Sequence, residues 1–168
     1  SFSILSTDDV TNINLEQLEP SFMYTQLFKD VLMKMNHSQQ SRQHFVHHCR
    51  VSLPHSARTS ALLDEFEREY SAETAIRWYT RPCFLFGMLN QSLRLLQVET
   101  IVTMGFFLVD LHRQIELLHA QQIHRHRVQS LTVYRGQSLS TYDFRKLNRT
   151  TGGLISFNSF LSTSKSKD

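Results

Sequence analysis

The sequence contains few cysteines, prolines and glycines and no long apolar run, and each shortage excludes a class of protein. Its 168 residues include two cysteines, three prolines and five glycines. Cys49 and Cys83 do not form a Cys-x-x-Cys pair, which argues against a disulfide scaffold or a zinc ribbon. No apolar run approaches the roughly 20 residues that a membrane-spanning helix needs. We therefore expect a soluble chain with no evident membrane partner. Its compartment stays open, with an intracellular one slightly favoured.

Positive and negative residues are both spread along the sequence. Lys and Arg together number 18 and Asp and Glu 15, which gives a formal net charge of +3. The basic residues are spread along the chain, and Arg125 and Arg127 are interpreted as part of a solvated link, so nucleic acid is not an expected partner. A chain of 168 residues that is 40% hydrophobic has the size of one domain and can bury a core.

The apolar residues from Leu15 to about Arg127 recur at helical spacing and predict a helical bundle. Its clearest helix carries an apolar stripe with alternating spacings of three and four. The stripe consists of Ile101, Met104, Leu108, Leu111, Ile115 and Leu118. We expect one continuous helix here, with a partner element that covers the stripe.

Prolines and aromatic residues indicate where other helices begin and end. Pro20 and Pro82 are each expected in the first turn of a helix, where proline is tolerated because the missing N–H would have no helical partner. The helix that contains Pro82 should begin after Thr80. Trp78 and Tyr79 should end the helix before it.

After Gln129 the spacing changes to that of β-strands. Leu131 to Arg135 alternate between two faces, and Gly136 ends this first strand. Ser140 is expected to cap a short helix that carries Tyr142, Phe144 and Leu147. The Gly152-Gly153 pair then leads into a second strand, Leu154–Phe157. The pattern predicts an α+β fold in one domain, with a helical lobe over residues 1–128 and the first strands of a sheet over residues 129–168.

Two motifs lie at the ends of these strands, Tyr134-Arg135-Gly136 and the segment from Ser156 that ends in Ser162-Thr163-Ser164. In this order and separation they resemble the arginine-specific mono-ADP-ribosyltransferases. That family builds its NAD pocket from an aromatic-Arg-Gly strand, a Ser-Thr-Ser strand and a later Glu-x-Glu motif. The resemblance implies an ADP-ribosyltransferase-type β-sheet core after the helical lobe, and NAD as co-substrate.

The resemblance also assigns roles to individual residues. Arginine presents a rigid fork of donors that suits phosphate groups, and Arg135 is expected to contact the NAD phosphate and ribose. Gly136 should bind the nicotinamide carboxamide through its main chain, since it has no side chain to keep a ligand away. Ser162 is expected to bind the nicotinamide-side ribose and to orient the catalytic glutamate. Arg135 and Ser162 are thus the candidate catalytic residues, while Thr163 and Ser164 are expected to be structural.

The implied reaction transfers ADP-ribose from NAD to an arginine side chain of a protein substrate and releases nicotinamide. The family's Glu-x-Glu lies some tens of residues after the Ser-Thr-Ser motif, whereas this sequence reaches only Asp168. We expect the sequence to be a fragment that is truncated before this motif and is inactive or impaired. Two alternatives stay open. One is an NAD glycohydrolase that uses the same site with water as acceptor, and the other is a non-enzymatic helical module that binds a protein partner.

Two further clusters are interpreted as ordinary helix surface. Glu65, Glu67 and Glu69 precede the other motifs and belong to an expected amphipathic helix, so they are not assigned as the missing Glu-x-Glu. His44 and His48 have a one-turn spacing that could place both on a zinc ion. The metalloprotease pattern requires a glutamate after the first histidine, and here that residue is Phe45, so no metal site is expected.

Overall fold

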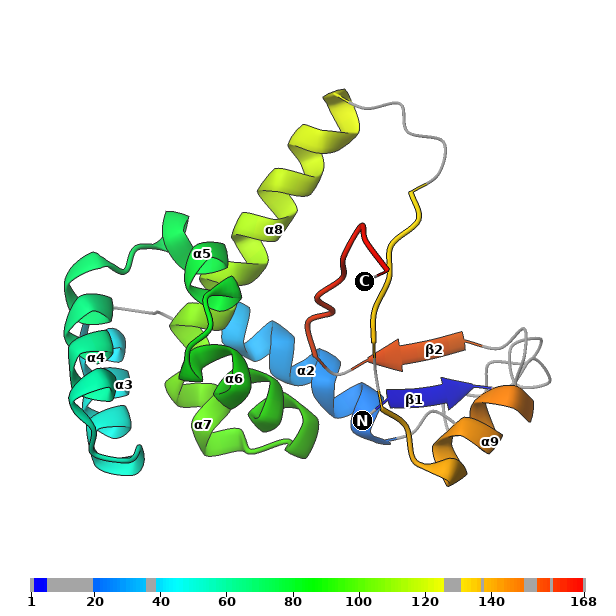
Figure 1. Ribbon diagram of the computed structural model, residues 1–168, viewed down its shortest axis with the longest axis horizontal. Helices are drawn as coiled ribbons and strands as arrows, with labels where there is room; N and C mark the ends of the chain where they lie inside the picture. Colours follow the sequence, from blue (N-terminus) through cyan, green and yellow to red (C-terminus); the bar gives the residue numbers. More distant parts are fainter. Residues whose placement is uncertain are drawn as a thin grey trace. The chain divides into compact units, whose positions relative to one another are not determined.

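The computed structural model describes residues 2–5, 20–35, 39–125, 131–136, 138–149, 154–157 and 159–167, and these are predominantly helical (Figure 1). In chain order the elements are β1 Phe2–Leu5, α2 Pro20–Lys34, α3 Gln39–Ser52, α4 Ala57–Glu69, the 3₁₀ helix η2 Ala72–Thr74, α5 Ala75–Thr80, α6 Phe84–Leu95, α7 Val98–Thr103, α8 Gly105–Arg125, α9 Thr141–Arg149 and β2 Leu154–Phe157. Among the described helices, none combines the length and the apolar character needed to cross a bilayer.

The chain forms two compact units. Residues 31–127 make up the helical unit, which contains α3 to α8, and residues 1–30 with 128–168 make up the strand-bearing unit. The predicted boundary between helical lobe and sheet region was residue 128, and the structure groups residues 1–30 with the sheet region.

The core of the helical unit is built around the ring of Phe66 on α4. This ring stacks on Tyr70 at a centroid distance of 4.6 Å and meets the edge of Trp78 on α5 at 5.0 Å. Phe45 on α3 lies 5.7 Å from Phe66, and Phe106 on α8 lies 6.4 Å away. Since the side chains of all five are buried, their rings join four elements in one apolar cluster.

Polar contacts at the edge of this cluster hold the short elements in place. The Tyr70 hydroxyl donates to Asp110 Oδ2 on α8 at 2.8 Å. Burial raises the pKa of Tyr70, and the charge of Asp110 raises it further. Gln114 on α8 accepts a hydrogen bond from the main-chain N–H of Ile76 at 2.7 Å and donates to the main-chain oxygen of Glu73. A single α8 side chain therefore binds backbone groups in η2 and at the start of α5.

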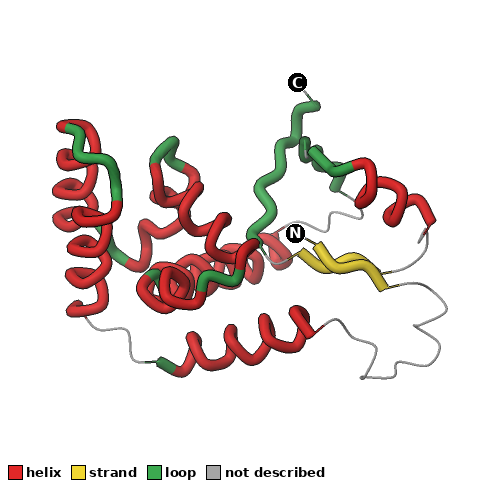
Figure 2. Tube along the Cα trace, turned by 90° about the horizontal axis from the view of Figure 1, so that it is seen from below, coloured by secondary structure: helices red, strands yellow, loops and turns green. Residues whose placement is uncertain are grey.

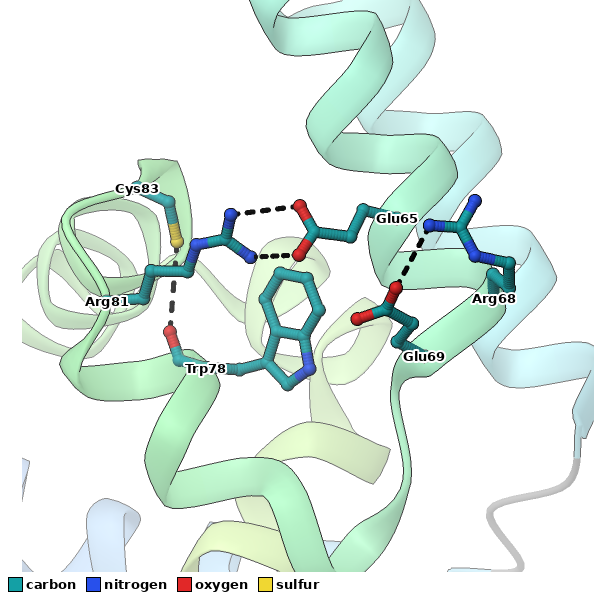
Figure 3. A network of polar contacts seen from close by, with 6 residues as sticks. All are labelled: Glu65, Arg68, Glu69, Trp78, Arg81 and Cys83. Carbon is teal, nitrogen blue, oxygen red and sulfur yellow. Dashed lines mark hydrogen bonds and ion pairs between the residues drawn. The ribbon is translucent and has the colours of Figure 1, made fainter.

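The Glu65 carboxylate joins α4 to the connection between α5 and α6 (Figure 3). Arg81 donates to both of its oxygens, at 2.6 and 2.9 Å, and the guanidinium carbon lies 5.0 Å from the centre of the Trp78 ring. The hydrogen bond from Arg81 is the main cause that lowers the pKa of Glu65. Glu67 and Glu69 pair with Arg50 and Arg68, and the predicted amphipathic helix with these glutamates at its surface is confirmed as α4.

Several predicted helix boundaries are confirmed. The predominantly helical character of the region before residue 128 is confirmed for the described residues, and α2 begins at Pro20. Trp78 and Tyr79 lie at the end of α5, which stops at Thr80. Pro82 was expected in the first turn of the next helix, and this is wrong, because α6 begins at Phe84 with Cys83 as its N-terminal cap.

The prediction of one continuous helix with a covered stripe is also wrong. The chain leaves helical geometry at Met104, where φ is −90° and ψ is 6°, so α7 ends at Thr103 and α8 begins at Gly105. Glycine is a poor helix former, which favours a break at this place. Only the first part of the stripe is covered: Met104 is fully buried, whereas Ile115 and Leu118 are each 39% exposed.

The strand-bearing unit contains a two-stranded antiparallel sheet, which Figure 2 shows in yellow. The predicted strand Leu154–Phe157 is confirmed as β2, and it pairs with β1, with Phe2 opposite Phe157 and Leu5 opposite Leu154. The helix expected after Ser140 is confirmed as α9, which starts at Thr141. A larger sheet core stays a prediction.

The expected strand Leu131–Arg135 is not a regular strand. Only Tyr134 pairs, in an isolated bridge with Ser164. Some predicted positions lie outside the described residues. They are Leu15, Arg127, Gly152 and Gly153.

We expect Phe66→Ala to lower the free energy of unfolding by about 3–5 kcal/mol, because it leaves a cavity among four other rings. Leu95→Ala is the matched control at a side chain that is 62% exposed, and its effect should stay within about 0.5 kcal/mol. Urea unfolding followed by circular dichroism measures both. A loss below about 1 kcal/mol for Phe66→Ala would contradict the central place of this ring.

The two thiols should differ in reactivity. Cys49 is fully buried, and burial raises its pKa to about 12, so at pH 8 it is protonated and shielded. Burial also raises the pKa of Cys83, but this side chain is partly exposed. We expect Ellman's reagent to modify Cys83 in the folded protein and Cys49 only after unfolding. In the Cys49→Ser variant, Cys83 should still react with the reagent in the folded protein. Equal reaction rates for the two thiols would show the expectation to be wrong.

Candidate functional site

The two motif segments of the strand-bearing unit are joined by a pair of main-chain hydrogen bonds. The N–H of Tyr134 donates to the carbonyl oxygen of Ser164 at 2.8 Å, and the N–H of Ser164 donates back to the oxygen of Tyr134 at 2.8 Å. This mutual exchange is the hydrogen-bonded pair of an antiparallel ladder. Gly136 follows Tyr134 by two residues and Ser162 precedes Ser164 by two residues, so in an antiparallel pair both lie toward the same end.

The side chain of Arg135 adds a third link between the same segments. Its Nη1 atom donates to the main-chain oxygen of Ser162 at 2.8 Å, although the two residues are 27 positions apart in sequence. The structure therefore brings the two candidate catalytic residues within hydrogen-bond distance. The contact uses the carbonyl group of Ser162, so the hydroxyl group is not what holds the arginine.

Gly136 has open space where a side chain would begin. A Cβ atom built on this residue would meet no heavy atom within 4 Å, and its backbone is not in the left-handed region that favours glycine. Neither packing nor backbone conformation of the described protein thus requires glycine here. A ligand that approaches the main chain closely would supply a reason for it.

The residues of the site are exposed, and the sequence on either side of them is basic. Tyr134, Arg135, Gly136 and Ser162 are all exposed to solvent. Across residues 131–167 the sequence is rich in cationic side chains, and Asp143 is the only acidic one. The basic residues are Arg135, Arg145, Lys146, Arg149, Lys165 and Lys167. Such an excess of positive charge favours an anionic ligand, for example a pyrophosphate.

The histidines of α3 are not arranged as a metal site. His48 Nε2 lies 3.5 Å from the hydroxyl oxygen of Ser52, and the neighbouring Cys49 points into the core, where it is fully buried. Within the described ranges, no three His, Cys, Asp or Glu side chains come together as ligands of one ion.

Comparison of the chain with protein-family models, curated proteins and solved structures found no match.

Sequence reasoning located the segments of this site but missed the atoms that join them. Ser162 takes part through its carbonyl oxygen, which every residue offers, and Ser164 through its N–H and carbonyl groups, which every residue other than proline offers. The serine hydroxyls that drew attention in the sequence do not form these links. The pattern of side chains in a sequence does not predict main-chain contacts. Predicting them would have required the register in which the two segments pair.

Because these links are main-chain bonds, we expect Ser162→Ala and Gly136→Ala to change the free energy of unfolding by no more than about 0.5 kcal/mol. Ser164→Pro removes a donating N–H and should open the pair. Amide hydrogen exchange by NMR provides the local measurement. Protection of the Tyr134 amide should survive in the first two variants and fall in the third, and its loss in Ser162→Ala would contradict the assigned contacts.

Proposed function

We propose that the chain is part of an NAD-dependent protein-arginine mono-ADP-ribosyltransferase, with Arg135, Gly136 and Ser162 in its NAD-binding site. In this proposal the strand-bearing unit is the start of an ADP-ribosyltransferase-type β-sheet core, so the fold class is α+β. The observation that supports the proposal is the hydrogen bond from Arg135 to the Ser162 carbonyl, because it joins the two motif segments, which are distant in sequence.

The residues fit the chemistry of NAD. A guanidinium group offers a planar fork of N–H donors for phosphate and ribose oxygens, and Arg135 is fixed at one end by its bond to Ser162. The open space at Gly136 leaves main-chain groups accessible to an amide such as that of nicotinamide. The hydroxyl of Ser162 supplies a donor and an acceptor for a ribose hydroxyl.

The proposed reaction exchanges one bond at the anomeric carbon of the nicotinamide ribose. The bond to the nicotinamide nitrogen breaks, a bond to a guanidine nitrogen of the target arginine forms, and that nitrogen loses a proton. The guanidinium group is protonated at neutral pH and a poor nucleophile, so the reaction needs a nearby carboxylate. The family places it in a Glu-x-Glu motif after the Ser-Thr-Ser segment. The residues named in this proposal are expected to bind NAD, so NAD binding is the property that tests them.

Two ligands separate the roles of Arg135 and Gly136. Arg135→Ala removes a charged donor and should weaken both NAD and ADP-ribose by about 10- to 100-fold, which corresponds to a charged hydrogen bond of about 1.5–3 kcal/mol. Gly136→Ala should weaken NAD but not ADP-ribose, which lacks the nicotinamide group. Isothermal titration calorimetry measures these affinities.

Arg149→Ala, at an exposed arginine of α9, is the matched control for lost positive charge and should change either affinity less than about threefold. Absence of saturable NAD binding in the unmodified chain would reject the proposal and favour a non-enzymatic interaction module. If Arg149→Ala and Arg135→Ala weakened NAD binding equally, the binding would be explained by general electrostatic attraction and not by a specific site at Arg135. An NAD glycohydrolase would give the same binding results, and it differs only in using water as acceptor.

A further inference from the structure

The hydrogen-bond ladder between the two motif segments stops earlier than its register allows. In an antiparallel ladder, pairs of residues that exchange two main-chain hydrogen bonds alternate with pairs that exchange none, and we call an exchanging pair a rung. Tyr134 and Ser164 form one rung, so the next would join Gly136 to Ser162. This rung is open: among the described residues, neither the N–H nor the carbonyl group of Gly136 has a hydrogen-bond partner.

The side chain of Arg135 occupies the acceptor that the open rung would use. Its Nη1 atom donates to the main-chain oxygen of Ser162 at 2.8 Å, and in a regular ladder this oxygen accepts from the N–H of Gly136. A hydrogen bond from a charged donor is stronger than one from a neutral N–H group. Arg135 therefore has the advantage over Gly136 in the competition for this carbonyl group.

The open rung leaves the main chain of Gly136 available to a ligand. Gly136 is exposed, and a Cβ atom built on it would meet no heavy atom within 4 Å. The N–H and carbonyl groups of one residue in a rung point to the same edge of the strand, and together they match a primary amide, which offers both donors and an acceptor. If the rung closed, Ser162 would use both groups and an amide ligand would lose them.

We infer that Arg135 is a positioning residue for the main chain of Gly136, in addition to its proposed contact with the NAD phosphate. By holding the Ser162 carbonyl group, it prevents the rung between Gly136 and Ser162 from closing. A guanidinium group has five N–H donors, so this bond does not exhaust its capacity for a phosphate group. The state of the rung is a property of the chain alone, whereas its use by the amide of nicotinamide rests on the proposed function.

NMR measures the state of the rung without a ligand. In the unmodified chain the Gly136 amide should exchange nearly as fast as in an unfolded peptide. In Arg135→Ala we expect a scalar coupling to appear across a new hydrogen bond, between the Gly136 nitrogen and the Ser162 carbonyl carbon. Exchange of the Gly136 amide should slow by roughly two- to tenfold, which corresponds to the net contribution of one main-chain hydrogen bond.

Two variants serve as controls for this measurement. Arg135→Lys keeps a cationic donor and should leave the Gly136 amide unprotected, because an ammonium group can also donate to the Ser162 carbonyl. Arg149→Ala removes an exposed positive charge on α9 and should change neither the coupling nor the exchange rate. Protection of the Tyr134 amide is followed in every variant, since it reports that the two segments still pair.

Free nicotinamide tests the functional consequence, because it has an amide group but no phosphate for the arginine to bind. In the unmodified chain it should shift the resonance of the Gly136 amide. Arg135→Ala should weaken this binding at least about fivefold, since the closed rung uses the groups that the amide needs. An arginine that only contacts the NAD phosphate would leave nicotinamide binding unchanged.

Three results would overturn the inference. They are a protected Gly136 amide in the unmodified chain, an unprotected one in Arg135→Ala while the Tyr134 amide stays protected, and equal nicotinamide binding in the two chains. If nicotinamide and NAD failed to bind the unmodified chain and the rung still closed in Arg135→Ala, the proposed function would be rejected and the positioning of Gly136 by Arg135 would stand. The two proposals can therefore fail separately.

Discussion

The contact of Phe66 with the rings around it is the interaction on which the helical unit depends. Its neighbours come from α3, α5 and α8, so these helices meet at one ring. Helix α5 spans only Ala75–Thr80, too short to be stable alone in water. It exists because Trp78 is inserted into the cluster and because Gln114 binds backbone groups at its start. Tertiary contact, and not helix propensity, therefore forms this part of the chain.

The strand-bearing unit is held in a different way. Its described links include main-chain hydrogen bonds, in the β1–β2 pair and between Tyr134 and Ser164, and the side-chain bond from Arg135 to the Ser162 carbonyl. Two-stranded sheets are marginally stable in water without further strands or an apolar cover. Among the groups proposed to bind NAD, Arg135 contributes one of the cross-links of this unit. A ligand that bridges the two segments would add support to the site it occupies.

The two proposals assign two tasks to Arg135. The strand-bearing unit offers exposed cationic and hydroxyl groups, which suit the phosphates and riboses of a dinucleotide. Its main chain at Gly136 suits an amide, and in the second proposal the bond from Arg135 to the Ser162 carbonyl keeps these groups unpaired. The first task requires a ligand and the second does not, so each can be tested without the other.

The sequence by itself determined the elements that depend on neighbouring residues: the start of α2 at Pro20, the helix after Ser140 and the strand Leu154–Phe157. Proline, capping residues and short apolar runs act over a few positions, which is why a local pattern sufficed. The motif that makes Arg135 a candidate site residue can also be read from the sequence, and its role stays a prediction. Only the tertiary structure decided the pairing of β1 with β2 and the bond from Arg135 to a carbonyl group. Each of these depends on residues far apart in sequence. The spacing of side chains along one element does not predict such contacts.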